Sequence, residues 1–390
     1  MELTIGGHRR ARRAYGLDEL ALAPGLVAVD PDDTDISLSI GSMKLELPFF
    51  ASAMDGAVDV RLACEMSRVG GLAVLNGEGL QTRYENPDEI ITQIIQEPVE
   101  TVVPLIQKMY REPVREDLVA LRVKQIKDGG GRAVLSFTPL GAHLANAAVE
   151  AGTDAIVIQS TVTTVEFKTT KPYSFDLARF CRDMSTHATP VPVIVGNSVT
   201  YDGTLSLMRA GATAILVGVG PGAACTTRRV IGLGVPQATA IADAAQARDD
   251  FQKESGNYVP IIGDGGLRTG GDVCKAIACG ADGVMMGQPV AGSKEAPGQG
   301  FHWGMATSSA GLPRGTRIKV GHNYSLEQDL LGPAVKDDGT LNFAGALRTG
   351  MGNCGALTIR EMQQAELLIA PTLQTEGKRQ QIDQHVGQGK

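Results

Sequence analysis

A glycine-rich segment that leads to a cysteine is the part of this sequence best suited to chemistry. Gly218, Gly220 and Gly222 alternate directly after an apolar run, and Cys225 follows them before a predicted helix. Alternating glycines leave the backbone open to a ligand or a cation. A thiol near the start of a helix, with Arg228 close by in the sequence, is a candidate nucleophile because both neighbours favour the thiolate. Taken alone, a cysteine in such a loop is more often a small packing residue.

Two further glycine-bearing segments follow the last two apolar runs of this kind. Asp264 stands before Gly265 and Gly266, and Gly287 precedes Gln288. A carboxylate suits paired hydroxyl groups, and exposed backbone amides suit an anion. An isolated Asp-Gly pair is usually only a turn. Two such loops at adjacent strand ends nevertheless predict a binding site for an anionic group.

The elements that must position these loops form a repeating unit. A helix-like stretch ends in a small residue and a glycine, and a short apolar run rich in β-branched residues follows at once. Glycine just past a helix end takes the left-handed conformation, and uninterrupted apolar runs are typical of strands buried on both faces. The eight predicted strands are 49–51, 72–75, 133–135, 156–158, 193–195, 215–217, 259–262 and 284–286.

Eight parallel strands can close into a barrel or form an open sheet, and apolar periodicity does not distinguish the two. Polar or glycine-rich segments follow nearly every predicted strand, which is typical of a barrel whose ligand-binding loops share one face. We therefore predict an α/β fold with a single TIM (β/α)8 barrel over residues 48–370, between an N-terminal extension at 1–47 and a polar tail at 371–390. Residues 292–345 are predicted to form a long flap after the last strand. Helical patterning returns over 347–368.

Composition excludes several classes of partner. The 390 residues are 43% hydrophobic and 20% charged with a net charge of -7, so a large core is expected and attraction to nucleic acid or anionic membrane is not. The basic stretch at 8–13 precedes no apolar signal-like segment, and no run reaches membrane-spanning length, so a cytoplasmic location is expected. The six cysteines are sparse and irregularly spaced, which predicts reduced thiols.

The Cys225 segment resembles the G-x-G-x-G-x-x-C-x-T active-site loop of the IMP dehydrogenase and GMP reductase family. The similarity runs from Pro48 to about Met362. It implies that Cys225 attacks C2 of a purine nucleotide and that Thr227 assists at the same loop. It also implies that carbonyl groups of Gly220, Gly222 and Cys225 can ligate a monovalent cation such as K+.

Further segments match the family in the expected order. The segment 51–55 resembles the family's S-x-M-D segment near the nucleotide, and Asp264 is implied to hold ribose hydroxyls beside a phosphate bound by the neighbouring glycines. The segment 302–305 resembles the one that closes over the purine ring, where Gly304 and Met305 would offer backbone contacts. The implied substrate-binding residues are Ser52, Met54, Gly222, Asp264, Gly265, Gly266, Gly287, Gln288, His302, Gly304 and Met305.

The implied cofactor site shows one departure from the family. Asn197 lies in a segment that resembles the G-N-x-x-T loop beside the nicotinamide, although a strand-end turn is an equally common interpretation. Gln159, Ser160 and Thr161 stand where the family usually has Asp-Ser-Ser. The implied NAD-binding residues are Gln159, Ser160, Thr161, Asn197 and Gly218. Ala223 stands where relatives usually present a serine to the phosphate, so phosphate binding would depend on backbone amides.

The flap carries the least specific match. Arg314 resembles the arginine that activates water to hydrolyse the covalent intermediate, but Gly315 follows it where the family normally has tyrosine. Arg317 is a rival for this role. Two solvated loop arginines are the alternative interpretation.

The resemblance implies an IMP dehydrogenase that oxidises IMP to XMP with NAD through a Cys225 thioimidate, in guanine nucleotide biosynthesis, as a homotetramer or higher homo-oligomer. GMP reductase, which converts GMP to IMP with NADPH, is the competing interpretation, because its loop also reads G-P-G before the cysteine and C-T-T-R after it. The segments 236–240 and 295–298 favour the dehydrogenase. A catalytically silent nucleotide-binding paralogue is the third interpretation, motivated by Gln159 and Ala223. Residues 75–133 are too few for the family's tandem CBS domains.

Overall fold

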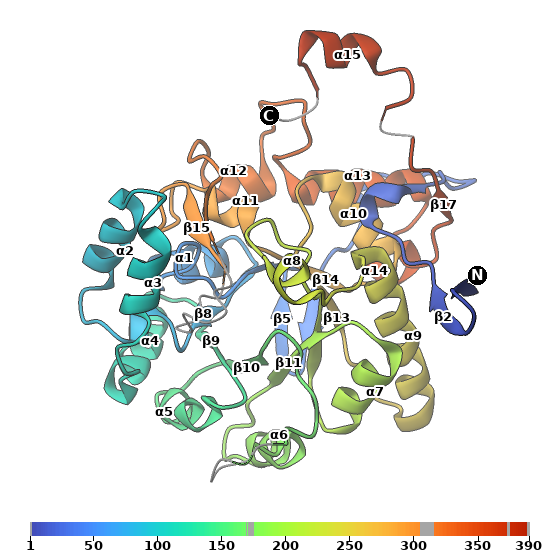
Figure 1. Ribbon diagram of the computed structural model, residues 1–390. Helices are drawn as coiled ribbons and strands as arrows, with labels where there is room; N and C mark the ends of the chain where they lie inside the picture. The colour runs from blue at the N-terminus through green and yellow to red at the C-terminus, as the bar shows by residue number, and fades with distance from the viewer. Residues whose placement is uncertain (1, 169, 171–174, 305–315, 373–374, 388–390) are drawn as a thin grey trace.

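The computed structural model describes residues 2–168, 170, 175–304, 316–372 and 375–387, and its centre is a closed parallel sheet (Figure 1). The second strand is split into β7 (Leu72–Ala73), which pairs with the first strand, and β8 (Leu75–Asn76), which pairs with the third. The two edges of the sheet therefore meet in one chain segment. The remaining strands are β6 (Phe49–Ala51), β9 (Val134–Phe137), β10 (Ala155–Gln159), β11 (Val193–Ser198), β12 (Ala214–Val217), β13 (Ile261–Asp264) and β14 (Gly283–Met286). The predicted (β/α)8 barrel and its eight strands are confirmed.

Alternation along each strand divides the apolar residues between two cores. Ile194 packs inside the barrel with Val157 and Leu216, whereas its neighbours Val193 and Val195 pack outside against the helices. Figure 1 shows helices arranged around the strands. The helices that follow the barrel strands are α1 (Val60–Arg68), α4 (Glu116–Asp128), α5 (Ala145–Glu150), α6 (Leu177–Ser185), α7 (Tyr201–Arg209), α9 (Gln237–Ser255), α10 (Gly270–Ala278) and α13 (Phe343–Cys354).

A β-hairpin closes the amino-terminal end of the barrel. It consists of β4 (Leu38–Ile40) and β5 (Met43–Leu45), and its buried leucine and isoleucine side chains belong to the same core as the barrel interior. Gly41, at its turn, lies next to Pro192 and Thr213, which precede β11 and β12. Because this hairpin fills the amino-terminal end of the barrel, the carboxyl ends of the strands form the face where a ligand can enter.

The long connections carry further elements. Helices α2 (Pro87–Gln96) and α3 (Val102–Met109) follow β8. The predicted flap contains an antiparallel pair, β15 (Phe301–Trp303) and β16 (Arg317–Lys319), and helices α11 (Gln288–Ala291) and α12 (Leu326–Leu331) lie before and after it. The other elements are β1 (Glu2–Ile5), β2 (Arg9–Arg12), α8 (Thr227–Ile231), and α15 (Arg379–Gln384), which stands apart at the top of Figure 1. None of the helices within the described ranges is long and apolar enough to cross a membrane.

The helical pattern predicted for 347–368 is wrong at its end. Helix α14 (Ile359–Met362) follows α13, but β17 (Leu367–Ile369) is a strand that pairs antiparallel with β3 (Leu20–Leu22). The partner strand lies at the other end of the sequence, so the local pattern did not reveal this pairing.

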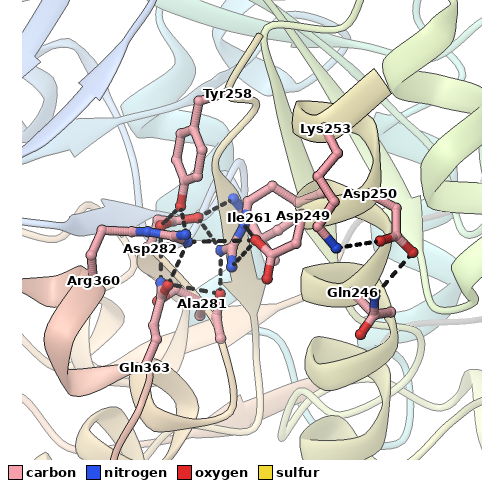
Figure 2. A network of polar contacts seen from close by, with 12 residues as sticks. Gln246, Asp249, Asp250, Lys253, Tyr258, Ile261, Ala281, Asp282, Arg360 and Gln363 are labelled. Carbon is pink, nitrogen blue, oxygen red and sulfur yellow. Dashed lines mark hydrogen bonds and ion pairs between the residues drawn. The ribbon is translucent and has the colours of Figure 1, made fainter. Parts of the chain in front are cut away.

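A buried ion pair joins α9 to the residue just before β14, and Figure 2 shows the network of polar contacts around its carboxylate. Arg248 of α9 is 2% exposed and Asp282, just before β14, is 3% exposed; Nη1 of the arginine lies 2.9 Å from Oδ2 of the aspartate. Tyr258 and Gln363 donate hydrogen bonds to the other carboxylate oxygen, and the backbone N–H of Ile261 donates to Oδ2. The network joins α9, β13 and the segment after α14 at the end of the barrel away from the ligand face.

Candidate active site

A cleft of about 1260 Å³ opens at the carboxyl ends of the strands. Every predicted site residue that the structure describes lines this cleft, except Arg317, the rival of Arg314. The residues that line it are Ser52, Met54, Gln159, Ser160, Thr161, Asn197, Gly218, Gly220, Gly222, Cys225, Thr227, Asp264, Gly265, Gly266, Gly287, Gln288, His302 and Gly304. Nη1 of Arg317 donates to the carbonyl oxygens of Ile94 and Ile95 in α2, so the structure does not bring it to the cleft. Met305 and Arg314 lie outside the described residues. The barrel thus gathers loops from Ser52 to Gly304, at opposite ends of the barrel sequence, into one site.

Cys225 is the exposed thiol of the chain. All six cysteines are described, and the other five are buried or half-buried. Burial raises the pKa of Cys181, Cys274 and Cys279 to about 12, which makes those thiols unreactive. The Cys225 Sγ lies 3.2 Å from Oγ1 of Thr227, the first residue of α8, and donates a hydrogen bond to it. The thiol is therefore open to the cleft and oriented by a hydroxyl group.

Arg228 supports the loop that carries Cys225, here called the thiol loop, through hydrogen bonds to its backbone. Its Nε donates to the carbonyl oxygen of Val219 at 3.2 Å, and its Nη2 donates to that of Val235 at 2.7 Å. Gly220 has a φ of +79°, and a Cβ there would lie 2.5 Å from Cγ of Arg228. The arginine predicted to favour the thiolate thus has its described hydrogen bonds on backbone carbonyls, where it shapes the loop.

Asp264 ends β13 at the centre of the cleft. Its Oδ2 accepts hydrogen bonds from Nδ2 of Asn197 at 2.7 Å and from Nε2 of Gln159 at 3.2 Å. Burial raises the pKa of Asp264 to about 6, and the hydrogen bond from Asn197 opposes this shift. Two residues predicted for the cofactor therefore contact the carboxylate predicted for the substrate.

The glycine turns after the last strands let neighbouring loops approach closely. Gly265 and Gly266 have φ values of +83° and +78°, a left-handed region that favours glycine. A Cβ on Gly266 would lie 3.1 Å from Cβ of Pro221 in the thiol loop, and a Cβ on Gly287 would lie 2.5 Å from Cε of Met54. The loops after β12 and β13 are thus in contact, as are those after β14 and β6.

Two neighbouring residues of β15, His302 and Trp303, face different surroundings. His302 is 2% exposed, lines the cleft, and has no hydrogen-bond partner for either ring nitrogen within the described residues; burial lowers its pKa to about 4. Trp303 points the other way, and its Nε1 donates to the hydroxyl of Tyr110 at 2.9 Å. Tyr110 in turn donates to Oδ2 of Asp55 at 2.5 Å. Asp55, from the segment after β6, is therefore linked through Tyr110 to Trp303 and so helps to hold the antiparallel pair of β15 and β16, the flap ribbon, in place.

Some residues of the cleft were not predicted. Gln237, the first residue of α9, donates from Nε2 to the carbonyl oxygens of Val217 at 2.7 Å and Asp264 at 3.3 Å, and so bridges the ends of two strands. The sequence of its segment, 236–240, favours the dehydrogenase but does not predict this bridging position. Residues 16–19 also line the cleft, and Tyr15 holds them by a hydrogen bond from its N–H to Oγ1 of Thr239 at 2.8 Å. No motif in the N-terminal segment signalled this position.

The cleft suits a nicotinamide nucleotide beside a second ligand. It is larger than the pockets of about 300–1000 Å³ that hold single small molecules. Leu140, Val162 and Phe167 are exposed and line it, and such apolar side chains suit the rings of a dinucleotide. Within the described residues no group of three or more His, Cys, Asp and Glu could hold a metal ion. A cation at the thiol loop would therefore depend on backbone carbonyls, of which that of Gly222 already accepts the N–H of Cys225 at 3.0 Å.

The fold and the cleft define a (β/α)8-barrel enzyme with an exposed thiol at its mouth. The sequence profile of the IMP dehydrogenase / GMP reductase domain matches residues 14–379, so the chain belongs to this family and is one of its oxidoreductases, as the Cys225 segment predicted. An uncharacterized oxidoreductase of Mycolicibacterium smegmatis is 36% identical over 375 residues, which cover 94% of this chain and 99% of that protein.

More distant and structural relatives agree with the assignment. The inosine-5'-monophosphate dehydrogenase of Methanocaldococcus jannaschii is 28% identical and is aligned over 94% of this chain and 95% of its own length. The crystal structure of an IMP dehydrogenase/GMP reductase-like protein from Corynebacterium glutamicum superposes with a TM-score of 0.88 at 34% identity and covers 94% of this chain and 97% of that one. A matching fold over nearly the full length supports the barrel.

Proposed function

We propose that this protein is an IMP dehydrogenase that oxidises IMP to XMP with NAD. The observation that carries the proposal is the exposed Cys225 thiol, 3.2 Å from the Thr227 hydroxyl, in one cleft with Asp264 and the glycine turns after β13 and β14. A nucleophile, a carboxylate for ribose hydroxyls and backbone amides for phosphate are what a nucleoside monophosphate requires.

The chemistry assigns a separate task to each group. The Cys225 sulfur adds to C2 of the hypoxanthine ring, a hydride leaves C2, and a thioimidate joins the protein to the base. NAD, when bound, accepts that hydride. Water then adds to C2 and the thiol leaves, which releases XMP and regenerates Cys225. Thr227 holds the sulfur at the mouth of the barrel, and Arg314 stays the predicted group that activates the water.

GMP reductase is the second candidate, because the segment from Gly220 to Arg228 also fits that activity. Reduction of GMP requires an acid to assist loss of ammonia from C2. The stretch 301–320, which forms the flap ribbon and the connection within it, contains no aspartate or glutamate. This observation favours the dehydrogenase.

The proposal is tested by incubating the protein with IMP and NAD, following NADH absorbance, and measuring the mass of the intact protein after quenching. We expect NADH to form and an adduct on Cys225 to appear. Cys225→Ser should lower the rate by about 10³-fold or more and abolish the adduct. Cys354→Ser, a half-buried thiol outside the cleft lining, is the control and should leave both unchanged. NADPH oxidation with GMP, or nucleotide binding without any adduct, would overturn the proposal.

A further inference from the structure

The side chain at position 159 makes contacts that a cofactor ligand would not need. Gln159 is 6% exposed at the end of β10. Its Nε2 donates to Oδ1 of Asn197 at 2.9 Å and to Oδ2 of Asp264 at 3.2 Å, while its Oε1 lies 3.4 Å from Oγ of Ser136. A glutamine amide has two N–H donors, so both are used within the protein. The side chain has no donor left for a bound dinucleotide.

Asn197 completes the same arrangement from β11. Its Nδ2 donates to Oδ2 of Asp264 at 2.7 Å, and its Oδ1 accepts from Gln159. Both amide donors therefore converge on one carboxylate oxygen, which leaves Oδ1 of Asp264 without a described partner. An ionised carboxylate accepts hydrogen bonds only, so Oδ1 is the atom available to the hydroxyls of a sugar.

We propose that Gln159 is a positioning residue for the ribose of the nucleotide substrate, which acts by holding the Asp264 carboxylate, together with Asn197, in its ionised form and in one orientation. The inference rests on the proposed function, because it takes the substrate to be a ribonucleotide. It assigns Gln159 to the substrate rather than to the cofactor. Asn197, which keeps one N–H free of described partners, is the residue of the pair that can still meet a cofactor.

The two amides are the side-chain hydrogen-bond donors that the described residues place on the Asp264 carboxylate. Ser136 on β9 donates to Gln159, and Gln237 on α9 donates to the backbone carbonyl oxygen of Asp264; neither carries a charge. No hydrogen bond or ion pair in the described ranges joins Asp264 to a charged or titratable group. The groups of this kind that line the cleft are Asp18, Glu19, Arg228, Arg268, Asp272 and His302, besides Cys225, which bonds to Thr227. Burial raises the pKa of Asp264 to about 6, so the loss of a donor should change its ionisation within an accessible pH range.

A glutamate at position 159 would reverse the electrostatic effect. It cannot donate when ionised, and its charge would stand beside that of Asp264, which disfavours ionisation of both. Gln159→Glu should therefore weaken the contact to ribose hydroxyls at neutral pH. Gln159→Met keeps the length of the side chain and adds no charge, so it removes the donor to Asp264, together with the 3.4 Å contact from Ser136, and is the variant expected to fold in the native way.

The experiment measures direct binding of two probes, IMP and its 2′,3′-dideoxy form, between pH 5 and 8 without cofactor. Both probes carry the same phosphate. The affinity for IMP divided by the affinity for the dideoxy form is therefore independent of phosphate titration, and this ratio reports the hydroxyl contacts. In the unmodified protein we expect this ratio to rise with pH, with a midpoint near 6. Gln159→Met should move the midpoint up by as much as about one pH unit, and Gln159→Glu by about one unit or more. The affinity for the dideoxy form should change less than about twofold.

A surface pair supplies the matched control. Gln246 donates to Asp250 at 2.9 Å on the exposed side of α9, so Gln246→Glu introduces the same charge beside a carboxylate away from the cleft and should leave the ratio unchanged. The inference is overturned if IMP binds to the unmodified protein and neither Gln159 variant moves the midpoint. It is also overturned if Gln159→Met raises KM for NAD at pH 8 without changing the ratio, which would make Gln159 a cofactor contact. If the unmodified protein binds neither probe at any pH, the proposed function itself is wrong.

Discussion

Replacing Asp282 by asparagine should destabilise the protein because it leaves a buried arginine without its charge partner (Figure 2). Arg248 is 2% exposed, and its Nη1 contacts Oδ2 of Asp282 at 2.9 Å and the carbonyl oxygen of Gly280 at 2.7 Å. In asparagine an NH₂ group, which is a donor, replaces one of the two carboxylate oxygens. It would face one of the two pairs of donors that now bind the carboxylate. Those donors come from Tyr258 and Gln363 on one oxygen and from Arg248 and Ile261 on the other.

The size of the effect follows from this burial. Removal of one partner of a buried ion pair costs about 3–5 kcal/mol of unfolding free energy, because the remaining charge is desolvated and uncompensated. Asp249 also contacts the guanidinium of Arg248 at 2.9 Å but is 40% exposed, so it compensates only in part. We expect a loss of about 3 kcal/mol. Glu254→Gln, which weakens the 2.6 Å pair with Arg209 whose side chains are 51% and 53% exposed, should cost far less, because solvent screens an exposed pair.

Urea unfolding followed by circular dichroism measures both variants under the same conditions. IMP binding should be unchanged in folded Asp282→Asn protein, since the network lies at the opposite end of the barrel from the cleft. The double variant Arg248→Met, Asp282→Leu should recover much of the loss, because it removes both charges and keeps apolar volume. The reasoning is refuted if Asp282→Asn costs no more than Glu254→Gln, or if the double variant is less stable than Asp282→Asn.

Two further predictions concern the cleft. His302 should make the protein less stable as the pH falls from about 6.5 toward 4, because burial lowers the pKa of the folded histidine to about 4 and the unfolded chain takes up a proton first, an effect of up to about 3 kcal/mol. His302→Asn should flatten this dependence in urea titrations at pH 5 and 7, and an equal slope in both proteins would contradict it. Gly218→Ala would place a Cβ 2.2 Å from the carbonyl oxygen of Asp264, so we expect a loss of about 1–3 kcal/mol and weaker IMP binding. Gly7→Ala, with no atom within 4 Å of its Cβ, should change neither quantity, and equal effects at the two positions would argue against the clash.

The sequence alone predicted the features that lie within short segments. The predicted barrel strands are mainly apolar runs of three or four residues, and burial on both faces of a parallel sheet makes such runs recognisable without knowledge of their partners. The Cys225 loop and the Asp264 turn are equally local, since the glycines, the thiol and the carboxylate lie within a few residues of one another. The structure places these segments on one face because parallel strands end at the same edge of a barrel.

Tertiary structure decided the features that depend on contacts between distant segments. Gln159 and Asn197 meet Asp264 across 105 and 67 positions of sequence, so no local pattern could show that both amides serve one carboxylate. The folded loop likewise decided the hydrogen bonds of Arg228, which go to the backbone carbonyls of Val219 and Val235. Leu367 and Leu368 were predicted within a helical pattern but belong to strand β17, because β3 pairs with their backbone groups. Local propensities differ by only about 1 kcal/mol per residue, and long-range pairing and burial exceed that amount.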